Sequence, residues 1–457
     1  MIRIDELADD VLLQIFEFYV FERPRYGDKT RVEKWQSLVH VCRRWRTLVL
    51  GSPRRLNLRL LCTPQTPAKH ILDVWPALPL IVDGNMALSS GTDSVVTALG
   101  LSSRVRRVAL RGLSGCQLEQ VLAAMEVPFP ELTDLYLSSN GETPPVIPDP
   151  FLDKSAPRLR HLRLDGIPFP ELPKLHLSAT HLVDLLLFNI PHSGYFSPEA
   201  IVALISALSS LKLLSLEFQS PQSRPDRETG LPPSKRSLIP ALRYLRFKGV
   251  VEYLEDLVTG IDTPQLDVIE IAFFNQIDFD APRLAQFINC TPKLEKRDAS
   301  VLFYDDSAVI GLSPGTLTIE ISCREPDCQL SSVQQLCSSL HFLSMLVNLY
   351  IEHHYRIYRR LVWRNDAIES TLWLQLLLPF TAVKNLYLSK EFAPGIATAL
   401  QELDGGRITE VLPNLGNIFV EGLEPSGLFQ ENIGQFVAAR QLSDHTITVS
   451  DWDGYRR

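Results

Sequence analysis

The sequence predicts an α/β protein in two parts, a short helical module followed by a long array of repeats. Residues 9–50 carry apolar side chains at helical spacing, whereas the pattern L-x-x-L-x-L recurs between residues 105 and 420. A repeat of this kind contributes one strand, and stacked repeats bury their apolar faces against one another. We therefore expect a horseshoe-shaped solenoid with a parallel strand from each repeat on its concave face.

Composition limits the classes of protein that the chain can belong to. With 45% hydrophobic and 21% charged residues, the composition is that of a globular protein. The net charge of −8 argues against binding along a nucleic-acid backbone, which requires a basic face. Seven cysteines without a CxxC pair indicate reduced thiols, and no apolar stretch reaches the length of a membrane span. We expect a cytoplasmic or nuclear protein with no membrane partner.

The first predicted helix begins at Asp9, whose carboxylate can cap the free N–H groups of the first turn. Apolar side chains then recur on one helical stripe as far as Tyr19. A second helix is predicted over residues 33–50, where apolar residues repeat at spacings of three and four. Gly51 and Pro53 are expected to end this helix.

Two segments of this module resemble the F-box motif. They are Leu7-Ala-Asp-Asp-Val-Leu-Leu-Gln-Ile-Phe16 and Leu38-Val-His-Val-Cys-Arg-Arg-Trp45. Residues 52–60 resemble the continuation seen in many fungal F-box proteins, so the likeness covers about the first 50 residues and a short extension. The family usually has Leu-Pro where this chain has Leu7-Ala8, and the missing proline removes a residue that favours the start of a helix.

The resemblance implies a three-helix F-box over residues 1–51 that binds the Skp-type adaptor of a cullin-type (SCF) ubiquitin ligase. By motif position, the apolar contacts and the core of the module would come from Leu7, Leu12, Ile15, Phe16, Val41, Cys42 and Trp45. A module of this size buries little surface alone, so a partner that covered an apolar face would stabilise it. The alternative is that the helices only cap the first edge of the repeat array.

The repeat pattern has ten good copies. They start at Val105, Leu132, Leu159, Leu182, Leu211, Leu242, Leu266, Leu346, Val383 and Leu415, with degenerate copies at Leu294 and Thr316. The first seven starts are 23 to 31 residues apart, close to the roughly 20–29 residues of a leucine-rich repeat. We expect a leucine-rich-repeat array over residues 105–457, preceded by a junction and a first irregular repeat over residues 52–104. Residues 219–238 are polar and proline-rich, which predicts a disordered insertion or alternatively a lid.

Side chains between the strand leucines should face the concave surface, because successive residues of a strand point to opposite sides. Tyr350, Tyr387 and Phe419 hold the same position in three successive units, and Tyr136 and Arg163 occupy it in earlier ones. Aligned exposed aromatic side chains suit a protein-binding hot spot. Tyrosine also has a high strand propensity, so the same pattern can serve strand packing without any role in binding.

A basic, aromatic segment spans residues 352–364 and includes Arg356, Arg359 and Arg360. The planar guanidinium group of arginine can donate two parallel hydrogen bonds to a phosphate, so a phosphorylated part of a target could bind there. RNA held by stacking is a second reading, and a solvated surface is the third.

No motif for a catalytic, nucleotide-binding or metal site occurs in the sequence, and we expect no cofactor. The chain is therefore predicted to be a non-catalytic adaptor that binds a Skp-type adaptor, through it a cullin, and an unknown target protein. Such an adaptor acts by bringing its target close to another enzyme. The alternative function is a leucine-rich-repeat interaction scaffold with no link to ubiquitination.

Overall fold

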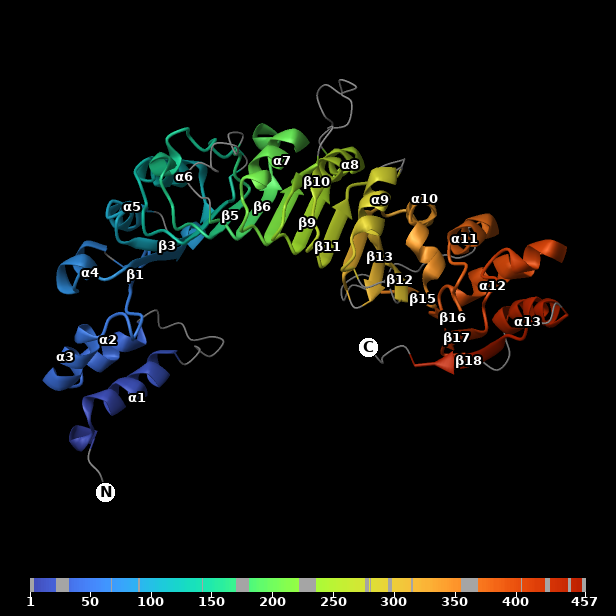
Figure 1. Ribbon diagram of the computed structural model, residues 1–457, viewed down its shortest axis with the longest axis horizontal. Coiled ribbons are helices and arrows are strands. Elements are labelled where there is room, and N and C mark those ends of the chain that lie inside the picture. The colour runs from blue at the N-terminus through green and yellow to red at the C-terminus, as the bar shows by residue number, and fades with distance from the viewer. Residues whose placement is uncertain are drawn as a thin grey trace. The chain divides into compact units, whose positions relative to one another are not determined.

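The computed structural model describes residues 4–21, 33–66, 68–88, 91–141, 143–169, 181–221, 236–275, 279, 281–294, 298–313, 315–354, 369–403, 405–423, 428–442 and 445–453. Contacts divide the chain into two compact units, Met1–Tyr195 and Phe196–Arg457. In both units helices accompany a sheet made mainly of parallel strands (Figure 1). Of the predicted insertion over residues 219–238, residues 222–235 lie outside the described part.

Three α-helices open the first unit. After a 3-10 turn, η1 (Ile4–Glu6), they are α1 (Asp9–Phe21), α2 (Lys34–Val39) and α3 (Arg43–Gly51). The single helix predicted over residues 33–50 is therefore wrong, because the chain turns at His40 and Val41. Cys42 is extended (φ −157°, ψ 170°), and its thiol accepts a hydrogen bond from the backbone N–H of Trp45, which starts α3 as a separate helix.

The sheet of the first unit has its strands in chain order, each parallel to the next. They are β1 (Leu60–Cys62), β2 (Leu80–Asn85), β3 (Val105–Leu113), β4 (Asp134–Ser139), β5 (His161–Asp165) and β6 (Asp184–Ile190). The connections contain α4 (Ala68–Val74), η2 (Met86–Leu88), α5 (Asp93–Leu99), α6 (Gly115–Ala124), η3 (Phe151–Lys154) and η5 (His192–Gly194). Regular strands thus begin before the first recognisable repeat at Val105.

The second unit continues the alternation of strands and helices. Its main sheet contains β7 (Leu213–Phe218), β9 (Tyr244–Gly249), β11 (Val268–Phe273), β12 (Asp298–Phe303), β13 (Ser307–Ser313), β14 (Leu317–Ser322), β15 (Asn348–His353), β16 (Asn385–Leu388), β17 (Asn417–Glu421) and β18 (Thr448–Trp452). A separate pair is formed by β8 (Ser237–Leu238) and β10 (Ile261–Asp262). The helices are α7 (Pro198–Ser206), α8 (Val251–Gly260), α9 (Pro282–Cys290), α10 (Pro326–Ser339), η6 (His341–Met345), α11 (Ser370–Leu377), α12 (Ala393–Gln401), η8 (Gly405–Thr409) and α13 (Leu428–Gln441).

One part of the second sheet departs from the predicted all-parallel order. The strands run β11-β14-β13-β12-β15, and β13 is antiparallel to both of its neighbours. Only residues 304–306 separate β12 from β13, and there the N–H of Tyr304 donates to the carbonyl of Ser307. A connection this short can join antiparallel strands only, since a parallel crossover needs a dozen or more residues. The two degenerate repeats belong to this hairpin region, which explains their poor match to the pattern.

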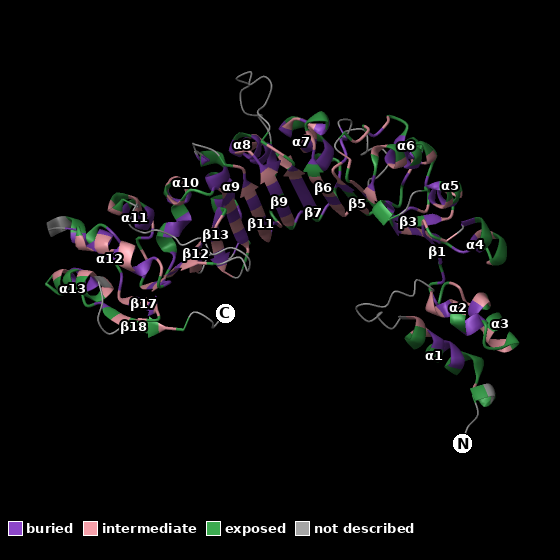
Figure 2. Cartoon of the chain, turned by 180° about the vertical axis from the view of Figure 1, so that it is seen from behind, coloured by how far each residue is buried: buried purple, intermediate pink, exposed green. Residues whose placement is uncertain are grey.

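The leucine pattern places its side chains in the core. In β4, Leu135 and Leu137 are buried while Asp134 and Tyr136 between them are half-buried, and β15 and β17 alternate in the same way. Figure 2 shows the alternation, with buried residues running through the strands and exposed ones on the outer sides of the helices. The predicted alternation of buried and surface-facing strand residues is therefore confirmed.

A ladder of side-chain amides joins the starts of β12, β15, β16 and β17. The Nδ2 of Asn348 donates to Oδ1 of Asp298 (2.6 Å), that of Asn385 donates to Asn348 (2.7 Å), and that of Asn417 donates to Asn385 (2.8 Å). Thr448 Oγ1 extends the ladder to β18 by donating to Asn417. The ladder fixes the register of these strands and so the alignment of the side chains that follow.

We expect Asn385→Ala to lower the free energy of unfolding of the second unit by about 1–3 kcal/mol, because Asn417 loses its acceptor and Asn348 its donor. Denaturant unfolding followed by circular dichroism measures this change. The matched control is Asn140→Ala, an exposed asparagine of the first unit, which should leave stability nearly unchanged. Equal midpoints for the two variants would show that the ladder contributes nothing.

Candidate interaction surfaces

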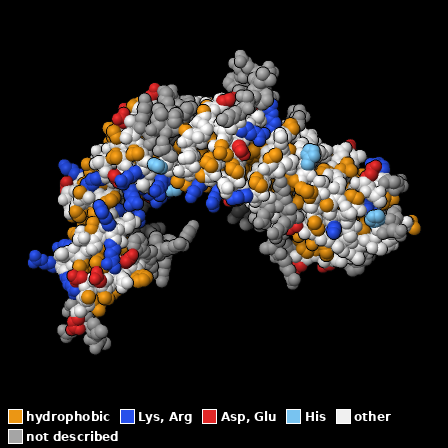
Figure 3. Space-filling view, in the orientation of Figure 1, with side chains coloured by type: hydrophobic (Ala, Val, Ile, Leu, Met, Phe, Trp, Pro, Cys, Tyr) orange, Lys and Arg blue, Asp and Glu red, His pale blue; other side chains and the backbone are white. Residues whose placement is uncertain are grey.

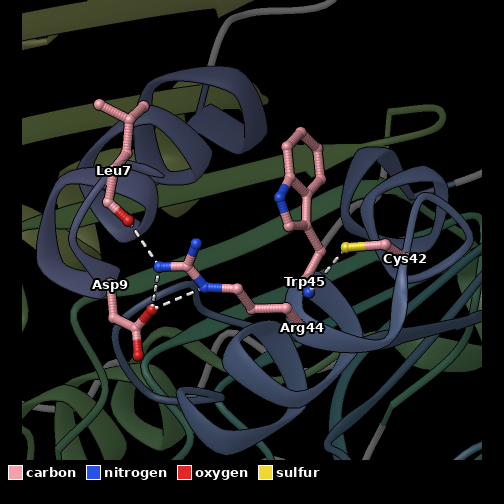
Figure 4. A network of polar contacts seen from close by, with 5 residues as sticks. All are labelled: Leu7, Asp9, Cys42, Arg44 and Trp45. Atoms are coloured by element: carbon pink, nitrogen blue, oxygen red, sulfur yellow. Dashed lines mark hydrogen bonds and ion pairs between the residues drawn. The ribbon is translucent and has the colours of Figure 1, made fainter. Parts of the chain in front are cut away.

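The N-terminal module is held together by an arginine that links α3 to the start of α1. Arg44 Nε and Nη2 donate to Oδ1 of Asp9 at 3.0 and 2.6 Å, and Nη2 also donates to the carbonyl of Leu7 at 2.5 Å (Figure 4). The helix begins at Asp9 as predicted, but the carboxylate of Asp9 pairs with Arg44, so the prediction that it caps the first turn is wrong. This network sets the position of α1 on α3.

The predicted adaptor-binding residues divide into a core group and an exposed group. Leu12 and Phe16 are buried, and the rings of Phe16 and Trp45 lie 4.7 Å apart between centroids. Leu7 and Trp45 are half-buried. These four residues therefore form or border the core of the module, and α1 turns its buried side towards α2 and α3 (Figure 2).

The exposed group lies at two places on the module, on α1 and in the turn before α3. On α1, the side chains of Val11 (41% exposed), Ile15 (43%) and Phe18 (79%) follow one another at spacings of four and three, which places them on one stripe. In the turn before α3, Val41 is 58% exposed, and Cys42 is exposed as well. Clustered exposed apolar side chains on a small module are typical of a surface that a partner covers.

Another side of the same module packs against the beginning of the repeat array. The side chain of Trp35 is fully buried, its Nε1 donates to the carbonyl of Arg59 at 3.0 Å, and its ring lies 5.0 Å from that of Trp75. The module therefore caps the array through α2 and still leaves Ile15 and Val41 exposed. Capping and docking, the two alternatives drawn from the sequence, use different sides of the module.

On the sheet of the second unit, Tyr350, Tyr387 and Phe419 form a stacked row. Register pairs Tyr350 with Tyr387 and Tyr387 with Phe419, and the ring centroids are 4.2 and 4.6 Å apart with an interplanar angle of 11° in both pairs. Trp452 of β18 adds its ring at 5.4 Å from Tyr387 and 6.0 Å from Tyr350. The predicted alignment is confirmed, and Trp452 is a member that the sequence pattern missed. We call these four residues the aromatic cluster.

The first unit carries a related row of arginine and aromatic side chains. The guanidinium of Arg163 lies 4.6 Å from the ring centre of Tyr136 and 4.5 Å from that of Phe188, and Arg111 lies 5.3 Å from Tyr136. Cation–π contacts of this kind hold long side chains in place on a sheet surface. Tyr136 and Arg163 thus lie together as predicted, whereas Arg111 and Phe188 were not predicted from the sequence.

The predicted basic segment lies almost wholly outside the described residues, including Arg356, Arg359 and Arg360. Its first residues are described. His354 Nε2 lies 3.1 Å from Glu352 Oε2, and this contact raises the pKa of His354, whereas burial lowers the pKa of His353.

The described residues also bear on metal binding, membrane spans and disulfides. Within them, no three histidine, cysteine or carboxylate side chains are grouped so as to hold a metal ion. No described helix has both the length and the apolar character that crossing a membrane requires. All seven cysteines are free thiols.

Comparison with known proteins finds matches among the solved structures. No protein-family model matches the chain, and no curated protein does. The solved structures include the crystal structure of the leucine-rich repeat-containing protein LegL7 from Legionella pneumophila, at 15% sequence identity over 83% of this chain and 97% of that chain, with a TM-score of 0.28. The repeat architecture of this chain follows from the strands and register described above.

Proposed function

We propose that this chain is the substrate-recognition subunit of an SCF ubiquitin ligase. In this proposal α1–α3 bind a Skp-type adaptor, which links the chain to a cullin, and the sheet surface of the repeats binds a target protein. The observation that carries the proposal is the exposed apolar surface of Val11, Ile15, Phe18 and Val41 on a module that is already anchored through Trp35. A module that served only as a cap would have no need for that surface.

Burial of apolar side chains would stabilise the contact with the adaptor. Covering the exposed parts of side chains such as Ile15 and Phe18 contributes about 1–2 kcal/mol each, and several together support a stable complex. The buried pair of Phe16 and Trp45 supports the surface from beneath and holds its shape. The resemblance of these helices to the F-box motif agrees with this role.

The target contact is assigned to the sheet surface. The aromatic cluster presents flat, half-buried rings that lose little side-chain entropy on binding. The chain contributes proximity, since it holds the target near the ubiquitin-charged enzyme and none of its own residues takes part in the bond being formed. This role places the protein in the cytoplasm or the nucleus.

Co-expression with a recombinant Skp-type adaptor tests the proposal. We expect the two proteins to co-elute from size-exclusion chromatography as a one-to-one complex and to bind a cullin together. Separate elution of a folded chain and a folded adaptor would contradict the ligase function.

A leucine-rich-repeat scaffold without a ligase partner is the second candidate. The packing of Trp35 on Arg59 and Trp75 favours it, because this contact is what an array cap requires. A target that binds the chain but is never ubiquitinated in the presence of the adaptor and the cullin would support the scaffold over the ligase subunit.

Tyr387→Ala is expected to weaken target binding by about 10-fold or more, because Tyr387 is central to the aromatic cluster and contacts both of its row neighbours and Trp452. The measurement is a titration of a target identified by proximity labelling and ubiquitin-remnant mapping. The control is Leu238→Ala, an exposed apolar side chain in the same unit that lies outside the aromatic cluster. Equal affinities for the two variants would move the target site away from the aromatic cluster.

A further inference from the structure

A row of basic side chains lies where the strands of the first unit begin. The N–H of Thr133 donates to the carbonyl of Arg106 at 2.8 Å, and the N–H of Arg160 donates to the carbonyl of Thr133 at 2.9 Å. Arg106, Thr133 and Arg160 therefore stand at the same level on three adjacent segments. Adjacent strands are about 4.8 Å apart, which separates the two arginine backbones by roughly 10 Å, a distance that their long side chains can bridge around one ligand.

A groove of about 560 Å³ opens at this row, and we call it the basic groove. Three arginines, Arg106, Arg158 and Arg160, line it together with His161 and His181. Two smaller cavities of about 360 and 160 Å³ share Arg106 and Thr133 with it and extend the lining to Arg104, Arg107 and Arg59. Figure 3 shows Lys and Arg side chains gathered over β1 and β3 on the face in view. This concentration of positive charge contrasts with the net charge of −8 of the chain.

Some of these cations are already compensated within the protein. Arg158 pairs with Glu131 at 2.5 Å, His161 lies 2.7 Å from Asp184, and Arg104 donates to the carbonyl of Leu78 at 2.9 Å. Asp134, the one carboxylate in the lining of the basic groove, accepts a hydrogen bond from the hydroxyl of Thr133 at 2.6 Å.

The guanidinium groups of three other arginines have no hydrogen-bond or ion-pair partner among the described residues. In the part of the chain that the structure describes, the guanidinium groups of Arg106, Arg107 and Arg160 are exposed, and none makes a hydrogen bond or an ion pair. Exposed, unpaired arginines that flank a groove are positioned to bind an anion from outside the chain.

We propose that the basic groove binds a phosphorylated segment of a partner protein. Each uncompensated cation of the groove is an arginine, and the planar guanidinium pairs with two oxygens of a phosphate at once. A phosphorylated serine or threonine carries negative charge and acceptor oxygens, and could therefore pair with Arg106 and Arg160, whose guanidinium groups have no anionic partner within the described chain. That this partner is the ligase target rests on the proposed function, whereas phosphate recognition by the groove does not.

Nucleic acid fits the basic groove less well. Single-stranded nucleic acid is usually bound by bases stacking on aromatic side chains, and no Phe, Tyr or Trp lines any of the three cavities. The acidic chain as a whole would also repel a long polyanion that extended beyond the groove.

Fluorescence anisotropy of the full chain with a pool of phosphoserine peptides of random flanking sequence tests the proposal. We expect the phosphorylated pool to bind at least about 10-fold more tightly than the same pool without phosphate. Arg106→Gln with Arg160→Gln should abolish this difference. Arg243→Gln is the matched control, because Arg243 is an exposed arginine just before β9 and contributes to none of the three cavities.

Three results would overturn the proposal. They are equal binding of the two peptide pools, an unchanged preference in the double variant, and a preference for a single-stranded RNA probe over the phosphorylated pool. Titration of the same preparation with the Skp-type adaptor separates the two proposals. If the chain binds the adaptor but shows no preference for phosphorylated peptides, only the proposal for the basic groove fails. If it prefers phosphorylated peptides but does not bind the adaptor, only the proposed ligase function fails.

Discussion

Ile15→Glu combined with Val41→Glu should lower the affinity for a Skp-type adaptor by about 100-fold or more, while the chain stays folded. Both side chains are exposed, at 43% and 58%, so the charges cost little in the free protein. In the complex the same carboxylates would be buried against an apolar partner surface without compensation. Isothermal titration calorimetry measures the affinity, and circular dichroism verifies that the variant is folded.

A matched control distinguishes a local effect from a general effect of added charge. Leu88→Glu places the same carboxylate on a side chain that is 79% exposed in the same unit, and we expect unchanged adaptor binding. Phe16→Ala is a poor probe, because Phe16 is 1% exposed and its loss would destabilise the module itself. Tight adaptor binding by the double glutamate variant would place the contact elsewhere.

Trp373→Ala should cause the largest loss of stability, about 3–5 kcal/mol. Trp373 lies on α11, is 1% exposed, and has its ring centre 6.2 Å from Phe303 and 5.5 Å from Phe392. Removing the indole leaves a cavity between a helix and two neighbouring elements, which the rigid backbone of stacked repeats cannot close. Denaturant unfolding of the second unit measures the loss.

The control for Trp373 is Leu442→Ala, whose side chain is 91% exposed and whose truncation should have almost no effect. Because the chain has two units, the transition of each unit has to be followed separately, for example by amide hydrogen exchange. A Trp373→Ala protein that unfolded at the same denaturant concentration as the wild type would mean that the α11 core contributes little.

Strand positions followed from the sequence where leucines alternate with surface residues. The repeats that start at Leu132 and Leu346 contain β4 and β15. Because every second strand residue is buried, a shift of one residue in strand pairing would expose the leucines, so only one pairing register is stable. Strands β1 and β2 lack the pattern and were not found. The direction of β13 was missed because strand direction is set by loop length, and the leucine pattern carries no information about it.

The interaction surfaces were predicted in part. Tyr350 and Tyr387 occupy equivalent repeat positions, so their stacking could be anticipated, whereas Trp452 follows no leucine motif. The basic groove gave no local signal, because Arg106 and Arg160 are separated by two repeats in the sequence. Parallel register alone brings them together. A search for one residue type at the same position of successive repeats would have found them.

Amide hydrogen exchange of the full chain, with and without a saturating recombinant Skp-type adaptor, tests the central claim most directly. The account predicts slower exchange confined to α1 and to the turn at His40 and Val41, with the sheet of the repeats unchanged. Unaltered exchange over α1, or protection that falls on the strands instead, would contradict it.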